Sequence, residues 1–187
     1  MSQSNSKRER LTAAARQLIH ATGYTQTTLA DIAQAADVPL GNVYYYFKTK
    51  QVLAQAVIEE QRQEFNQLTQ ELDRMSEPRA RIDGFLNMLV LESESIAAHG
   101  CPIGSLCTEL NKSDTQLAKL ANALMESQLE WLTRQFRQMG KTEEAAELAL
   151  QLLAQLQGAT VLTHVFQDPN MFTRQIANAK SWLYELA

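Results

Sequence analysis

Apolar side chains recur every three to four positions along most of the chain, which is the spacing of one face of an α-helix. Leu11, Ala15, Leu18 and Ile19 form one such stripe near the N-terminus. No run of Val, Ile and Thr alternates with polar residues as a half-buried strand would. Glycine, proline and capping residues interrupt the stripes and divide the chain into about nine helices. The pattern therefore predicts an all-α fold.

Three of the expected helices lie near the N-terminus and six lie in the rest of the chain. They comprise residues 6–22, 29–36, 40–47, 49–75, 79–98, a short helix that ends near 110 after a break over 99–107, 114–139, 143–166 and 169–186. Thr28 and Asp31 have the spacing of a capping box at the start of the second helix.

The segment 143–166 is apolar around most of its circumference, so we expect it to be buried on more than one side. In a body of this size the second side is best supplied by another subunit. Gly158 and Ala159 would let a partner helix approach closely.

Composition changes this picture in one respect, the distribution of charge. The 187 residues have 45% hydrophobic and 20% charged side chains, which is ordinary for a soluble globular protein. Residues 1–50 hold six basic and three acidic side chains, a balance of +3, whereas the remaining residues hold 11 and 18, a balance of −7. A basic first segment on an acidic body favours contact between that segment and a polyanion.

Apolar stretches stay far below the roughly 20 residues that span a bilayer, and the polar N-terminus lacks the apolar core of a signal peptide. We therefore expect a cytoplasmic protein without a membrane partner, with Cys101 and Cys107 as thiols. Three histidines and two cysteines lack the spacing of a zinc site, so we expect no metal.

Residues 27–50 carry the strongest functional pattern. They read Thr-Thr-Leu-Ala-Asp-Ile-Ala-Gln-Ala-Ala-Asp-Val-Pro-Leu-Gly-Asn-Val-Tyr-Tyr-Tyr-Phe-Lys-Thr-Lys. Two short helices joined by a tight turn form a helix-turn-helix, whose second helix enters the major groove of DNA. Val43 and Phe47 are four positions apart and should pack inward together. Three consecutive tyrosines cover about 300° of a helix, so some of them must be exposed.

The side chains expected to contact DNA lie on the remaining faces of this motif. Phosphate contacts set the register of a protein on DNA, whereas groups that reach base edges specify sequence. We expect Gly41, Tyr44 and Tyr45 to face the bases, with Leu40 at the leading edge, and Thr28, Asn42, Tyr46 and Lys50 to contact phosphates.

This stretch resembles the DNA-binding region of the TetR/AcrR family of repressors. The resemblance covers roughly residues 7–55: a first helix that ends in Gly-Tyr, then Thr-Thr-Leu-Ala-Asp-Ile-Ala, then Val-Pro-Leu-Gly-Asn-Val-Tyr-Tyr-Tyr-Phe-Lys-Thr-Lys. The family's DNA contacts fall on the same eight residues named above. Asn42 stands where Ser or Thr is more usual, and Tyr46 stands where His is frequent.

The resemblance implies a helix-turn-helix domain over residues 1–50 and an effector-binding and dimerisation domain over residues 51–187. It also implies a homodimer, joined through its last two helices, that binds double-stranded operator DNA. A ligand in the C-terminal body would change the separation of the two recognition helices and release the DNA. Because members of this family are more often repressors than activators, the resemblance favours a repressor.

The segment Gly-Cys-Pro-Ile-Gly-Ser-Leu-Cys at 100–107 resembles a Gly-Cys-Pro-x-Gly-x-Leu stretch in one branch of that family. Some members of the branch respond to electrophiles or oxidants, which would make Cys101 a sensor. Thiols near an imidazolium or a helix N-terminus have a larger thiolate fraction, and Cys107 could pair with Cys101 if the intervening loop bends. The alternative is that both cysteines are small buried hydrophobic residues.

Five further side chains are candidates to line an effector cavity, although ordinary core packing is the simpler interpretation of each: Met88, Met125, Trp131, His164 and Phe166. An imidazole buried on the apolar helix would need a partner, and a ligand could provide it.

An enzyme would need a nucleophile with a base, and Cys101 with His99 is the one pair in view. No glycine-rich phosphate loop or paired-carboxylate motif supports catalysis, so we expect neither an enzyme nor a cofactor. A purely structural helical adaptor would leave exposed tyrosines in a basic segment unexplained.

Overall fold

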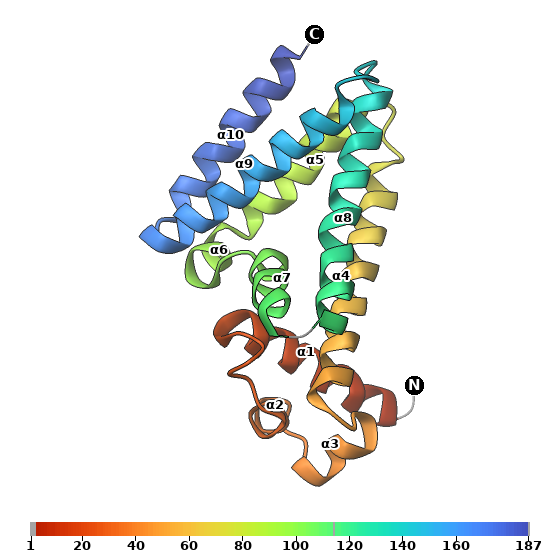
Figure 1. The fold of residues 1–187 in the computed structure, drawn as a ribbon, viewed down its shortest axis with the longest axis vertical. Helices are drawn as coiled ribbons and strands as arrows, with labels where there is room; N and C mark the ends of the chain where they lie inside the picture. The colour runs from red at the N-terminus through yellow and green to blue at the C-terminus, as the bar shows by residue number, and fades with distance from the viewer. Residues whose placement is uncertain (1–2, 114, 187) are drawn as a thin grey trace. The chain divides into compact units, whose positions relative to one another are not determined.

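The computed structural model describes residues 3–113 and 115–186, and their regular secondary structure consists of ten α-helices (Figure 1). The helices are α1 (Gln3–Thr22), α2 (Leu29–Ala35), α3 (Leu40–Tyr46), α4 (Lys50–Leu72), α5 (Pro78–Leu91), α6 (Ser93–His99), α7 (Pro102–Ser113), α8 (Thr115–Gln138), α9 (Ala145–Phe166) and α10 (Pro169–Glu185). The expected all-α fold is confirmed.

The helix expected over 79–98 is in fact two helices, α5 and α6, which meet at Glu92. The backbone of Glu92 (φ −92°, ψ 4°) leaves the helical region at that point. Apolar positions continue across the bend, from Leu89 and Val90 to Ile96 and Ala97. The apolar spacing therefore gave no sign of the interruption.

The break expected over 99–107 is much shorter in the structure, because α7 already begins at Pro102. Gly100 ends α6 with φ +77°, a left-handed conformation that glycine adopts without steric cost. Proline suits the first position of α7, where its missing N–H would have had no helical partner. Cys101 is thus placed directly before a helix N-terminus.

The helices form two compact units that do not follow the order of the chain. The first unit contains residues 1–63 and 105–124, and the second contains 64–104 and 125–187. Helices α4, α7 and α8 each begin in one unit and end in the other. The expected domains over residues 1–50 and 51–187 were defined by function, whereas these two units are defined by packing. The expected domain division therefore stays a prediction.

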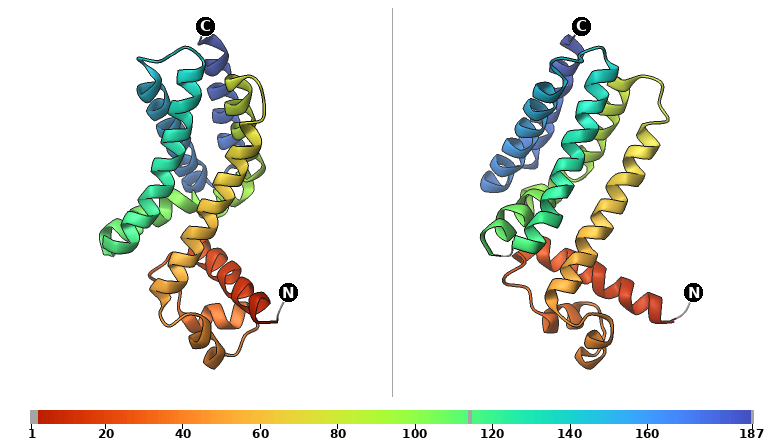
Figure 2. Two further views of the ribbon diagram at one scale, coloured as in Figure 1. Left: turned by 90° about the vertical axis from the view of Figure 1, so that its right-hand side faces the viewer. Right: turned by 45° about the vertical axis from the view of Figure 1, so that its right-hand side comes forward.

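In the first unit, α2 packs against both α1 and α3 (Figure 2). Leu11, Ile32, Val43 and Phe47 are fully buried between these short helices. The part of α7 and α8 that belongs to this unit buries a second group of apolar side chains, which comprises Leu106, Leu110, Leu117 and Leu124.

In the second unit, α9 packs against α6 and α10, and α10 also contacts α5. Its core contains Phe85, Trp131, Phe136 and Phe172, and the rings of Phe85 and Trp131 lie 5.6 Å apart. Burial of one such side chain contributes about 1.5–3 kcal/mol to the free energy of unfolding. This aromatic core holds α9 in place and leaves its other face outside.

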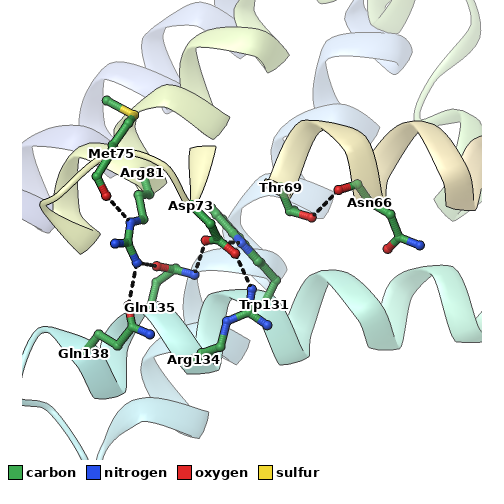
Figure 3. Close-up of polar contacts among 9 residues, drawn as sticks. All are labelled: Asn66, Thr69, Asp73, Met75, Arg81, Trp131, Arg134, Gln135 and Gln138. Atoms are coloured by element: carbon green, nitrogen blue, oxygen red, sulfur yellow. Dashed lines mark hydrogen bonds and ion pairs between the residues drawn. The ribbon is translucent and has the colours of Figure 1, made fainter. Parts of the chain in front are cut away.

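A polar network joins the residue after α4 to α8 within the same unit (Figure 3). Asp73 Oδ1 accepts hydrogen bonds from Trp131 Nε1 and Gln135 Nε2, both at 3.1 Å, and Asp73 Oδ2 pairs with Arg134 at 2.8 Å. Arg81 donates to the Met75 carbonyl oxygen at 2.7 Å and to Gln135 Oε1 at 3.2 Å. The indole N–H of Trp131 is therefore satisfied by the protein itself.

None of the helices in the described ranges is long and apolar enough to cross a membrane.

Candidate functional site

The second helix of the predicted helix-turn-helix begins with the expected capping box. The Thr28 hydroxyl accepts a hydrogen bond from Asp31 N (3.1 Å), and Asp31 Oδ2 accepts one from Thr28 N (3.0 Å). The same Thr28 hydroxyl donates to Asp31 Oδ2 at 2.6 Å. Hydrogen bonds from the Thr28 hydroxyl and then from its backbone lower the pKa of Asp31. The hydroxyl that we expect on a phosphate thus also starts α2.

The turn between α2 and α3 is anchored to α1. Asp37 adopts φ +49°, a left-handed conformation that Asp tolerates better than most residues. Arg10 of α1 donates to the carbonyl oxygens of Ala36 and Asp37 and lies 3.2 Å from the Asp37 carboxylate. These contacts fix the direction in which α3 leaves the turn.

Helix α3 has one face that is buried in the protein and one face that is exposed. Val43 and Phe47 are buried, as expected, with exposed fractions of 0% and 1%. Tyr45 is 76% exposed and Tyr44 is 48% exposed, whereas Tyr46 is half-buried. The rings of Tyr45 and Tyr46 meet edge to face at 5.0 Å. The outward face also includes Leu40, Gly41 and Asn42, all exposed.

Lys50 lies at the start of α4, and its ammonium group is directed into the turn between α1 and α2. Nζ donates to the carbonyl oxygens of Tyr24 (3.0 Å), Thr25 (3.2 Å) and Thr27 (3.0 Å). It also lies 4.4 Å from the centre of the Tyr24 ring. Because an ammonium has three donors, a phosphate contact by Lys50 would require it to release one of these carbonyls. That contact stays a prediction.

Cys101 lies at the N-terminus of α7 with two N–H groups directed at its sulfur. Gly104 N donates to Sγ at 3.2 Å, and Gln157 Nε2 of α9 lies 3.7 Å from it. A methyl group on Gly104 would come 2.5 Å from Gln157 Oε1 and 3.5 Å from Sγ. The thiol is partly exposed, and His99 is an exposed residue at the end of α6.

Cys107 is buried within α7. The segment between the two cysteines is helical and not a loop, so a rise of about 1.5 Å per residue places their Cα atoms about 9 Å apart. Disulfides join Cα atoms up to about 7 Å apart. A disulfide between Cys101 and Cys107 would therefore require the first turns of α7 to unwind.

The five expected cavity residues lie in different environments. Met88 and Phe166 are 45% and 60% exposed, Met125 is partly buried against the core, and Trp131 is buried. His164 is exposed, and its Nδ1 lies 3.0 Å from the carbonyl oxygen of Ala97. The imidazole thus has a partner in α6, and in this structure it does not need a ligand for that purpose.

Helix α9 exposes several large apolar side chains on the side opposite the core. Its core side contains Ala149, Leu152, Leu156 and Ala159. Its outward side contains Leu150, Gly158, Val161, Leu162, Val165 and Phe166, and the Val165 side chain is 65% exposed. Exposed apolar surfaces of this kind are typical of interaction sites for proteins, membranes or ligands.

The described residues contain no group of three or more His, Cys, Asp or Glu side chains arranged to hold a metal ion.

A capped helix, an anchored turn and a short helix with outward tyrosines define a helix-turn-helix DNA-binding protein. A sequence model of the tetR family of bacterial regulatory proteins matches residues 11–57, and a model of the C-terminal domain of LmrA/YxaF-like transcriptional regulators matches residues 78–178. The chain belongs to the TetR family, and it is a DNA-binding transcriptional regulator of that family.

Relatives and solved structures agree with this assignment. An uncharacterised HTH-type transcriptional regulator of Lactococcus lactis is 27% identical over 169 residues, 88% of this chain and 86% of that protein. The HTH-type transcriptional repressor NemR of Escherichia coli K12 is 28% identical over 119 residues, 64% of this chain and 59% of NemR.

Two crystal structures share the fold. A TetR regulator from Legionella pneumophila has a TM-score of 0.85 at 20% identity, over 99% of this chain and 97% of that one. The reduced form of Escherichia coli NemR has a TM-score of 0.76 at 20% identity, over 94% and 96%.

Three side chains that the sequence did not single out make contacts in one or the other unit, namely Arg10 and Glu109 in the first and Gln157 in the second. Their contacts join residues 26, 85 and 56 positions apart. A pattern of neighbouring residues does not reveal such pairs. The one local sign was the Gly-Tyr pair that ends the expected first helix, because Tyr24 N donates a hydrogen bond to Glu109 Oε2 at that end.

Proposed function

We propose that this chain is a homodimeric repressor that binds operator DNA through α3 and releases it when an effector acts on its C-terminal body. The observation that carries the proposal is the outward face of α3. There Tyr44 and Tyr45 are exposed above a fully buried Val43 and Phe47, in the part of the chain that matches the tetR family.

In this proposal Gly41, Tyr44 and Tyr45 face base edges, with Leu40 at the leading edge of the helix. Aromatic rings offer apolar contact to thymine methyl groups, and the phenol oxygens offer hydrogen bonds. Phosphate contacts are assigned to Thr28, Asn42, Tyr46 and Lys50. The Thr28 hydroxyl and the Lys50 ammonium group already form hydrogen bonds within the motif, so each would have to bind a phosphate in addition to these partners.

The outward face of α9 is assigned to the dimer interface, together with α10. Gly158 lies at the middle of this face and has open space around it, so a partner helix could approach its backbone closely. A symmetric dimer presents the same patch on both subunits. Its two recognition helices must then match major grooves about 34–36 Å apart, and a change in that separation releases DNA.

The sensing role is assigned to Cys101. The thiolate is the nucleophilic form of cysteine, and N–H groups directed at the sulfur stabilise it. Gly104 N and Gln157 Nε2 both contact the sulfur, so an adduct on Cys101 that breaks the second contact would displace Gln157. Gln157 is adjacent to Gly158, so this displacement would act directly on the proposed dimer helix. Escherichia coli NemR, which shares the fold, was crystallised in a reduced form.

A noncovalent effector is the second candidate, and one observation favours it. Gln61 on α4 is 7% exposed, and its Oε1 has no hydrogen-bond partner among the described residues. Buried acceptors are normally satisfied. A ligand with a hydrogen-bond donor would satisfy this one. Met88, Met125, Trp131, His164 and Phe166, which all belong to the second unit, stay candidates to line an effector site of that unit, separate from Gln61.

The test is a gel shift with purified protein on duplex DNA from around its own gene, with and without a quinone. A specific shift that quinone abolishes in the wild type but not in Cys101→Ser supports the thiol-sensing repressor. A specific shift that is indifferent to quinone supports DNA binding and removes the proposed sensing of quinones by Cys101. Failure to shift any duplex removes the proposed function.

A further inference from the structure

The turn between α1 and α2 is held by two opposite charges from distant parts of the first unit. Lys50 Nζ binds three of its carbonyl oxygens, as described above. The Glu109 carboxylate of α7 binds its amides, because Tyr24 N donates to Oε2 at 2.8 Å and Thr25 N donates to Oε1 at 2.6 Å. Both oxygens of one carboxylate thus engage two successive backbone N–H groups.

The backbone at this turn is shaped to admit the carboxylate. Gly23 has φ +88°, and a Cβ at this position would lie 3.0 Å from Glu109 Oε2. Burial raises the pKa of Glu109, but hydrogen bonds from Thr25 and Tyr24 and the charge of Lys50 outweigh it, so the pKa is lowered. The carboxylate is therefore charged at neutral pH, and its hydrogen bonds are charge-assisted.

Glu109 belongs to the helix that begins directly after Cys101. Thr28, which caps α2, follows the turn that Glu109 holds, and α2 packs against α3. Charge-assisted hydrogen bonds of 2.6–2.8 Å cannot lengthen by even 1 Å and persist. A shift of α7 must therefore either move the turn or break these bonds.

We infer that Glu109 is the positioning residue through which α7 transmits a change at Cys101 to the helix-turn-helix. This inference rests on the proposed function. It predicts that the Glu109 carboxylate determines how strongly modification of Cys101 changes DNA affinity, and not merely whether the protein folds.

The test compares operator affinity before and after modification of Cys101 by N-ethylmaleimide, with site occupancy verified by peptide mass spectrometry. The readout is the ratio of the two Kd values, measured on a duplex that the wild type binds. Typical allosteric couplings correspond to ratios of about 5–150. We expect about tenfold or more in the wild type and less than about twofold in Glu109→Gln, whose amide offers one acceptor where two are needed.

Glu130→Gln is the matched control, because it removes the same charge from an exposed position on α8. It should keep the wild-type ratio. Glu109→Asp keeps the carboxylate but is one methylene shorter, so it should give an intermediate ratio and also serves if Glu109→Gln fails to fold. Hydrogen exchange at Tyr24 and Thr25 should be faster in both Glu109 variants, with the second unit unchanged.

If modification of Cys101 changes the operator Kd about tenfold in the wild type and equally in both Glu109 variants, the inference is overturned, while the proposed repressor function is unaffected. A wild-type ratio near one overturns both the inference and the sensing role of Cys101, while DNA binding stands. A wild type that binds no duplex removes the proposed function and, with it, this inference.

Discussion

Replacing Asp73 with alanine should destabilise the protein much more than replacing it with asparagine. Asp73→Ala removes the acceptor of Trp131 Nε1 and Gln135 Nε2, on residues that are 3% and 0% exposed. An unpaired buried donor costs about 1–3 kcal/mol. Two donors would therefore cost about 2–6 kcal/mol. Because 33% of the Asp73 side chain is exposed, water can reach the vacated position, and we expect about 2–3 kcal/mol.

Asp73→Asn keeps the Oδ1 acceptor and loses the ion pair with Arg134, whose side chain is 51% exposed. Such surface pairs contribute about 0–1 kcal/mol. The assay is equilibrium unfolding in urea, followed by tryptophan fluorescence at one fixed protein concentration, since a dimer gains apparent stability with concentration. Equal losses for the two variants, or a loss below about 0.5 kcal/mol for Asp73→Ala, would refute the reasoning.

Three further predictions concern the first unit and the proposed interface. Gly23→Ala should lower the free energy of unfolding by about 1–2 kcal/mol, because alanine is strained at φ +88°. Thermal denaturation should show a lower Tm, whereas Gly41→Ala lies in α3 and meets no atom within 4 Å, so it should leave Tm unchanged or raise it. Val161→Glu should convert the dimer to a monomer in size-exclusion chromatography with light scattering, and a dimer that persists would place the interface elsewhere. The stability gap between the wild type and Glu109→Gln should be constant from pH 6 to 8. This difference in stability should disappear as the pH falls below 4.5, the ordinary pKa of a Glu carboxyl, because a carboxyl group with a lowered pKa stabilises the fold only while it is charged. A difference that persists at lower pH would contradict this prediction.

The features that the sequence predicted well are those decided within a few positions along the chain. The Thr28–Asp31 capping box and the inward pair Val43 and Phe47 depend on spacings of three and four residues, which helical geometry fixes. The apolar circumference of α9 was also read from local spacing. The structure buries one face of this helix against the core, and burial of the exposed apolar face by another subunit stays a prediction.

The features that the sequence missed depend on long-range contacts or on a single backbone angle. The sequence did not reveal that the three donors of Lys50 bind carbonyls 23–26 positions earlier in the chain, and its expected phosphate contact stays a prediction. His164 was considered as a buried group, but it borders the outward face of α9 and contacts the Ala97 carbonyl. The bend at Glu92 changes no side-chain pattern, so no apolar period could show it.

The most direct test of the central claim is duplex binding by the purified protein, measured by fluorescence anisotropy across a series of salt concentrations. The starting material is a pool of genomic fragments that includes the region around its own gene. We predict that the wild type selects specific fragments, that log Kd rises linearly with log salt concentration, and that Tyr45→Ala loses this binding while its oligomeric state and Tm are unchanged. A wild type that selects no fragment, or a Tyr45→Ala variant that binds as tightly as the wild type, would contradict the account.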